Sequence, residues 1–207
     1  MSVASAARRA TPPEQLAREQ PAGRPTAWWG MVLFVTTEAT LFAALFASYF
    51  YLRFRSAPQW PPGGIRAPQL RLPLIMTVLL VSSSAPMWWA DHGIRQGRSG
   101  RLKLGLAVTF ALGATFLALQ GHEYQTKLAE FTPRTNAYGS LFFGITGFHG
   151  AHVLLGLLMN AFVQVAAWRG RFTAERCLHV QLAALYWHFV DAVWIVILAS
   201  LYLGPHL

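Results

Sequence analysis

Apolar residues occur in five long stretches along the chain, separated by short polar segments. Each stretch reaches about 20 residues, the length that a helix needs to cross about 30 Å of hydrocarbon. The pattern therefore predicts five membrane-spanning helices, near residues 27–52, 73–91, 102–122, 137–168 and 178–203. The fourth stretch is long enough to tilt or to project beyond the bilayer. We expect an all-α fold, a polytopic membrane helix bundle.

Composition supports a membrane protein and argues against a nucleic-acid partner. Apolar residues make up 54% of the chain and charged residues 12%, far from an average soluble domain. The net charge of +9 could indicate nucleic-acid binding, but the basic residues are spread over four loops and a tail. Attraction to anionic lipid headgroups is the expected consequence, with Arg53, directly after the first span, as a headgroup contact.

The distribution of basic residues predicts the orientation. With the N-terminal tail in the cytoplasm, eleven of the 17 basic residues lie inside and six outside, which favours a cytoplasmic N-terminus and an external C-terminus. Residues 1–26 contain Pro, Arg and Glu without an apolar core, so we expect a disordered cytoplasmic tail and no signal peptide. Residues 27–207 then form a single transmembrane domain. Cys177 is the only cysteine, which excludes an internal disulfide.

Several ionisable residues lie within the predicted spans. Glu38 and Asp191 lie near the middle of the first and fifth spans, where a charge costs roughly 2.5 to 3.5 kcal/mol. His188 and Asp191 are three residues apart and share a helix face, and His149 and His152 repeat that spacing in the fourth span. We expect these five residues to form a buried polar cluster that faces protein or trapped water.

Three uses of such groups remain open from the sequence. Hydrogen bonding between helices is the favoured use, and proton handling or substrate contact is the second. Metal or haem ligation is the third, because histidines on two helices can bracket a haem. However, His149 and His188 differ in expected depth by about 6 Å at the helical rise, which weakens that use. We expect no metal or cofactor in this chain.

Ordered motifs in four of the spans resemble the subunit III family of haem-copper oxidases, which includes cytochrome c oxidase. The third span ends in a Gln-x-x-Glu-Tyr element, formed by Gln120, Glu123 and Tyr124. The other motifs are a Gly-to-Phe pattern at Gly30, Phe34, Thr37, Glu38, Phe42, Phe46, Tyr49 and Phe50; "TGFHGAHV" with Gly156; and "YWHFVDAVW" with Tyr186, Trp187 and Trp194. Many members have seven spans, so this chain resembles the shorter bacterial form. Gln181 stands where many relatives have Glu.

The resemblance implies a subunit without redox metals in a terminal oxidase of aerobic respiration. Haem and copper would reside in partner subunits I and II, and this chain would hold no catalytic centre. It would pack against the catalytic subunit I, bind membrane lipids, and support assembly, proton uptake and turnover. The implied location is the bacterial cytoplasmic (inner) membrane, as a multi-pass protein.

Within that role, Glu38, His188 and Asp191 are expected to form or support a hydrogen-bonded cluster that fixes helix packing. A direct proton relay through Glu38 is the bolder form of this hypothesis. Three alternatives stay open: an accessory membrane protein of a nitric oxide reductase system, a free-standing b-type cytochrome that uses His149, His152 and His188, and a small transporter.

Overall fold

The computed structural model describes residues 23–56, 60–62, 65 and 68–206, and within these ranges the ordered elements are helical. The helices are α2 (Thr26–Arg55), α3 (Arg71–Arg95), α4 (Ser99–Glu130), α5 (Ala137–Trp168) and α6 (Leu178–Ile197). The last continues as a π-helical segment, Leu198–Leu203, and a 3₁₀ turn, Gly204–His206. All five helices are long and apolar enough to cross a membrane, which confirms the predicted five-span all-α fold. The predicted tail lies largely outside the described residues.

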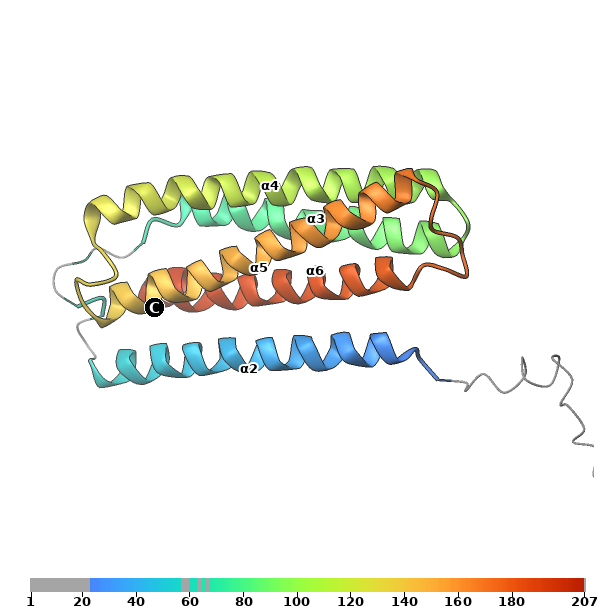
Figure 1. The fold of residues 1–207 in the computed structure, drawn as a ribbon. Helices are drawn as coiled ribbons and strands as arrows, with labels where there is room; N and C mark the ends of the chain where they lie inside the picture. The colour runs from blue at the N-terminus through green and yellow to red at the C-terminus, as the bar shows by residue number, and fades with distance from the viewer. Residues whose placement is uncertain (1–22, 57–59, 63–64, 66–67, 207) are drawn as a thin grey trace, which may run out of the picture.

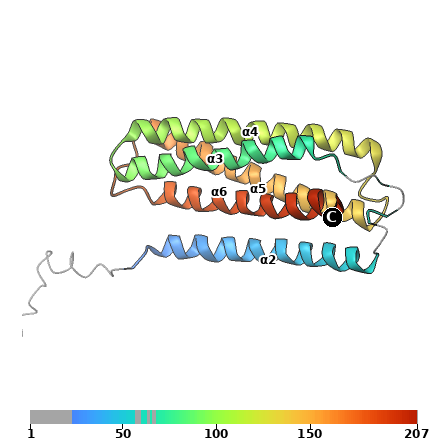
Figure 2. The same ribbon diagram turned by 180° about the vertical axis from the view of Figure 1, so that it is seen from behind.

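Successive helices run in opposite directions, so the chain crosses the bundle from end to end five times (Figure 1). The helices α3 and α4 lie side by side, α5 and α6 pack next to them, and α2 lies on the far side of α6 (Figures 1 and 2). Only 6% of the apolar span of α2 is buried, against 56% for α5 and for α6. The core of the bundle is therefore built by α3 to α6, with α2 as a peripheral helix.

Short connections at one end of the bundle hold neighbouring helices antiparallel. Gly97 and Gly170 follow α3 and α5 and adopt the left-handed backbone conformation, with φ of 71° and 69°. Glycine adopts this conformation without a steric penalty, so it terminates helices readily. At the opposite end, the Asn136 side chain accepts a hydrogen bond of 2.9 Å from the Gly139 amide and caps the start of α5.

Helix α4 extends further than its apolar pattern predicts. The predicted span ends at residue 122, whereas α4 continues to Glu130 and buries Glu123 and Lys127 in its last turns. Tyr202 donates a hydrogen bond of 3.1 Å to Glu123, and Lys127 pairs with Glu130 at 2.9 Å. Because these polar groups find protein partners, the helix does not need to end where the apolar residues end.

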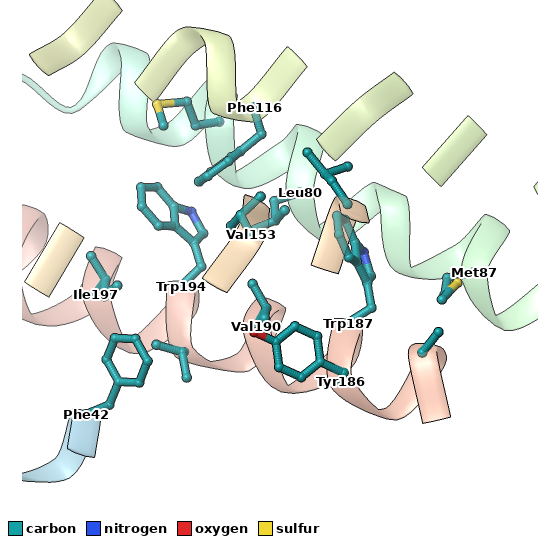
Figure 3. Close-up of a cluster of buried hydrophobic side chains, with 14 of the residues drawn as sticks. Phe42, Leu80, Met87, Phe116, Val153, Tyr186, Trp187, Val190, Trp194 and Ile197 are labelled. Atoms are coloured by element: carbon teal, nitrogen blue, oxygen red, sulfur yellow. The ribbon is translucent and has the colours of Figure 1, made fainter. Parts of the chain in front are cut away.

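Two tryptophans of α6 fill the centre of the core. Trp187 and Trp194 project from α6 toward α3 and α4, whereas Phe42 approaches α6 from α2 (Figure 3). Both indole N–H groups donate to hydroxyls of α3, to Ser83 at 2.8 Å and to Thr77 at 2.9 Å. Buried indoles need such partners, so these bonds fix the rotation of α6 against α3.

Close packing between α3 and α4 yields a first prediction. A Cβ atom on Gly105 would lie 2.5 Å from the Pro86 carbonyl oxygen and 2.8 Å from the Ala90 Cβ. We expect Gly105→Val to push the two helices apart and lower the free energy of unfolding by about 1 to 3 kcal/mol. Gly121→Val is the matched control, since a Cβ there meets nothing within 4 Å. Equal thermal stability of the two variants in detergent would contradict this account of the packing.

Candidate functional site

A polar cluster joins α3 and α6 in the interior of the bundle. Asp191, which is 6% exposed, accepts a short hydrogen bond at Oδ2 from the Ser84 hydroxyl. The same hydroxyl oxygen lies 3.0 Å from Nδ1 of His188. Asp191 Oδ1 is buried and has no hydrogen-bond partner within the described part of the chain.

When Asp191 is ionised, the hydrogen count sets the direction of these bonds. A serine hydroxyl carries one hydrogen, and here that hydrogen is directed at the carboxylate of Asp191. His188 must therefore donate from Nδ1 to the Ser84 oxygen, so Nδ1 carries a proton. The three side chains form a directed chain of hydrogen bonds that runs from the imidazole through the hydroxyl to the carboxylate.

A second polar pair joins α2 to α5. His152 Nε2 lies 3.0 Å from Glu38 Oε2, and His152 Nδ1 lies 2.6 Å from the Phe148 carbonyl oxygen. The side chains are 12% and 23% exposed. This contact is the polar link between the peripheral helix α2 and α5.

The geometry of this pair requires one shared proton. A carbonyl oxygen can only accept, so Nδ1 of His152 is protonated. The contact at Nε2 then holds one proton more, either on the imidazole with an ionised Glu38 or on the Glu38 carboxyl with a neutral imidazole. In both states the pair carries no net charge, which lowers the cost of placing it near the middle of a membrane span.

His149 has a different environment from the other two histidines. Its ring is fully buried, packs against both Phe116 and Trp194, and places Nε2 3.2 Å from the Val190 carbonyl oxygen. His152 and His188 contact Glu38 and Ser84, so the three rings face three separate partners. Among the described residues, no group of three or more His, Cys, Asp or Glu side chains is placed to hold a metal ion.

The Gln-x-x-Glu-Tyr element of α4 makes hydrogen bonds to neighbouring helices. Gln120 Nε2 donates to the Thr146 carbonyl at 2.6 Å, and the Tyr124 hydroxyl lies 2.7 Å from Thr146 Oγ1. Glu123 accepts from Tyr202, as described above. In α6, the Tyr186 hydroxyl donates to the His152 carbonyl at 3.2 Å. These contacts all cross between helices and place the motif residues in packing positions.

Arg53 contacts the C-terminal end of the chain. Its Nη2 donates a hydrogen bond of 2.6 Å to the Gly204 carbonyl. One helical turn earlier on α2, the Tyr49 hydroxyl donates to the Ser200 carbonyl at 3.0 Å. The guanidinium is partly buried. It ties the end of α2 to the end of the chain, and its headgroup contact stays a prediction.

An apolar groove with a basic end runs between α2, α5 and α6, and we call it the α5–α6 groove. One part, of about 340 Å³, is walled by apolar side chains that include Met31, Leu158 and Leu182. The adjoining part, of about 400 Å³, contains Arg171 and Arg176 from the α5–α6 loop. Both parts share Phe162 and His179, so they adjoin.

A second hollow, which we call the polar pocket, lies between α3, α6 and the start of α2. It has a volume of about 420 Å³ and is lined by Arg24, Pro25, Trp28, Trp88, Asp91, Arg95, Gln181, Ala184, Leu185 and His188. Arg95 pairs with Asp91 at 2.7 Å, and the Arg24 guanidinium lies 3.9 Å from the centre of the Trp28 ring. The pocket therefore meets the polar cluster at His188.

The expected single cluster is divided in the structure. His188 and Asp191 meet through Ser84, whereas Glu38 bonds to His152 and His149 bonds to the α6 backbone. The cluster is divided because Glu38 is on α2, which contacts α5 and α6, whereas Ser84 is on α3, which packs against α6. Sequence reasoning missed Ser84, although it shares one face of α3 with Trp88 and Asp91 at helical spacing.

Comparison with known proteins identifies a single family. Residues 19–205 match the family model described as cytochrome c oxidase subunit III. The chain is 37% identical over 179 residues to cytochrome c oxidase subunit 3 of Lumbricus terrestris, Cyprinus carpio and Arabidopsis thaliana. Each match covers 84% of this chain, and it covers 68%, 68% and 67% of those relatives, respectively. The resemblance read from the motifs is confirmed.

Proposed function

Because the chain belongs to the cytochrome c oxidase subunit III family, and so to an oxidoreductase complex of the haem-copper type, we propose that it packs against the catalytic subunit I and holds no redox metal itself. Haem and copper would reside in subunits I and II. In this role the chain supports assembly, proton uptake and turnover in aerobic respiration. The match over residues 19–205 carries the proposal, because it includes all five helices, the cluster of Ser84, His188 and Asp191, and the pair of Glu38 and His152.

The orientation forms part of the proposal. We place the N-terminus and the α3–α4 and α5–α6 loops in the cytoplasm of a bacterium, and the C-terminus outside the inner membrane. The excess of basic residues in the N-terminal tail and these two loops over the other loops, eleven against six, supports this placement. The described helices alternate in direction, so both loops lie at the same end as the start of α2 (Figure 1).

The contacts of the histidines argue against a free-standing b-type cytochrome. An axial histidine presents a ring nitrogen to the haem iron. Here Nε2 of His149 faces a backbone carbonyl, Nε2 of His152 faces a carboxylate, and Nδ1 of His188 faces a hydroxyl. The His149 ring is also fully buried against Phe116 and Trp194, so a haem could reach its Nδ1 only by displacing this packing.

Isolation of the intact complex tests the proposed function. An affinity-tagged chain, extracted in a gentle detergent, is expected to carry with it a large, haem-bearing polytopic protein, and the preparation is expected to reduce oxygen. The chain purified alone is expected to show no Soret band. A partner that reduces nitric oxide instead of oxygen would favour the accessory role in a nitric oxide reductase system, and stoichiometric haem in the isolated chain would overturn the proposal.

Lipid binding is the part of the proposal that the α5–α6 groove supports. Its apolar walls suit an acyl chain, and the basic end formed by Arg171, Arg176 and His179 suits the phosphate of an anionic headgroup. The groove lies at the end of the bundle that we place in the cytoplasm. Lipid held there would fill the space between α5, α6 and the peripheral helix α2.

Replacement of both groove arginines tests this assignment. We expect the double variant Arg171→Gln with Arg176→Gln to lose most of the anionic phospholipid that copurifies with the chain, because each basic residue contributes roughly 1 kcal/mol to such binding. Arg169→Gln is the matched control, because Arg169 is exposed in the same loop and does not line the groove. The measurement is mass spectrometry of bound lipid. Equal retention by the double variant and the control would contradict the assignment.

A further inference from the structure

The polar pocket gives access to a buried carboxyl from one end of the bundle. His188 lines the pocket, and beyond it lie Ser84 and Asp191, joined by hydrogen bonds. On α3, Ser84 lies 11 residues before Arg95, a depth of about 16 Å at the helical rise. Asp191 is therefore well within the bundle, yet a continuous series of polar groups leads to it.

Several features favour water in the pocket and a mobile proton behind it. A volume of about 420 Å³ has room for several water molecules, and its polar lining supplies partners for them. No protein partner of His188 Nε2 is found among the described residues, while Nδ1 bonds to Ser84. At the inner end, Asp191 Oδ1 is buried without a partner, so the carboxyl is not saturated by fixed donors.

We infer that Asp191 is a proton-binding site that exchanges its proton with water in the polar pocket through His188 and Ser84. The inference deepens the proposed function, because it identifies a place where a subunit that supports proton uptake can hold a proton. It follows from the juxtaposition of a pocket, an imidazole with one nitrogen toward that pocket, and a directed chain of hydrogen bonds that ends on a buried carboxylate.

The transfer balances without any other reactant. Hydronium in the pocket gives a proton to Nε2 of His188 and is left as water, and Nδ1 then passes its own proton to the Ser84 oxygen. At the same time Ser84 gives its hydroxyl hydrogen to Oδ2 of Asp191. The products are a neutral carboxyl, an intact hydroxyl and a neutral imidazole protonated at Nε2. The reverse sequence returns the proton to the pocket.

Other charged and titratable groups surround this path. Asp91 and Arg95 of α3 form an ion pair at the pocket wall, and Arg24 approaches from the start of α2. From α5, His149 contacts the carbonyl of Val190, the residue before Asp191. Glu38 of α2 is bonded to His152, as described above. Of these groups, Asp91 acts electrostatically on His188.

Infrared spectroscopy of the full chain in lipid vesicles tests the inference. The sequence holds two aspartates, Asp91 and Asp191, so carboxyl-labelled aspartate together with Asp91→Asn isolates the signal of Asp191. On acidification we expect the C=O band of a protonated carboxyl to appear and to shift with the label. After a rapid pH change, Ser84→Ala is expected to slow its appearance by roughly tenfold or more, since it removes the group that passes the proton.

Ser82→Ala is the matched control, because Ser82 lies on the same helix but donates to the Leu79 carbonyl. Its rate is expected to equal that of the unmodified chain. A labelled band that does not respond to pH, or equal rates in Ser84→Ala and Ser82→Ala, would overturn the inference. Failure of the chain to copurify with an oxidase would instead overturn the proposed function, and the infrared result would stand on its own.

Discussion

Replacing His152 with leucine is expected to lower the free energy of unfolding by roughly 2.5 to 3.5 kcal/mol, the cost of an unpaired ionised group at mid-membrane depth. In the unmodified protein, Glu38 and His152 share one proton across a 3.0 Å contact and carry no net charge. Leucine removes the partner and leaves the carboxyl beside apolar side chains. The contact also links α2 to α5, so detachment of α2 is the expected structural consequence. The measurement is denaturant unfolding in detergent micelles.

Two further variants separate the charge from the lost packing. The double variant Glu38→Gln with His152→Leu removes the ionisable carboxyl and is expected to recover most of the lost stability. His122→Leu is the matched control, because His122 is exposed on α4 and lies outside both polar clusters. If the double variant is no more stable than His152→Leu alone, packing of the imidazole against Phe42 explains the loss, and the charge does not.

The sequence predicts the number and approximate limits of the helices because burial in lipid imposes one simple requirement, a long apolar stretch. For the fourth span the predicted and observed limits agree at residues 137–168. Helices α2, α3 and α4 extend by a few residues at their ends, most of all α4, where Glu123 finds Tyr202. The fifth span, predicted over 178–203, is matched by α6 together with the π-helical segment that follows it. Apolar patterns cannot reveal such extensions, since they depend on a partner from another helix.

The pairing of polar groups depends on which helices are neighbours and how each is rotated. The sequence identifies Glu38, His152, His188 and Asp191 as groups that cannot face lipid, because their depth within the spans is enough for that conclusion. It gives no means to pair Glu38 with His152, since the two lie on helices far apart in the chain. The role of Ser84 was hidden for the same reason, as three consecutive serines face three different directions.

Trp187→Ala is expected to cause the largest loss of stability, about 3 to 5 kcal/mol, because it opens a cavity in the centre of the core. The indole fills the space that Gly113 and Gly156 leave open, where added Cβ atoms would lie 2.5 Å and 2.9 Å from its ring. The substitution also removes the donor that Ser83 accepts. The measurement is the free energy of unfolding of the full chain in detergent.

Trp187→Phe helps to separate these two contributions, since it removes the N–H donor but a much smaller part of the side-chain volume than Trp187→Ala does. We expect it to cost less than Trp187→Ala, about 1 kcal/mol for the lost hydrogen bond plus a smaller cavity cost. Trp168→Ala is the control for loss of an indole from the surface, because Trp168 is 63% exposed at the end of α5. Equal stability of Trp187→Ala and Trp168→Ala would mean that α6 does not depend on this indole. The close approach of α4 and α5 to α6 at Gly113 and Gly156 would then have a cause other than the fit of this indole.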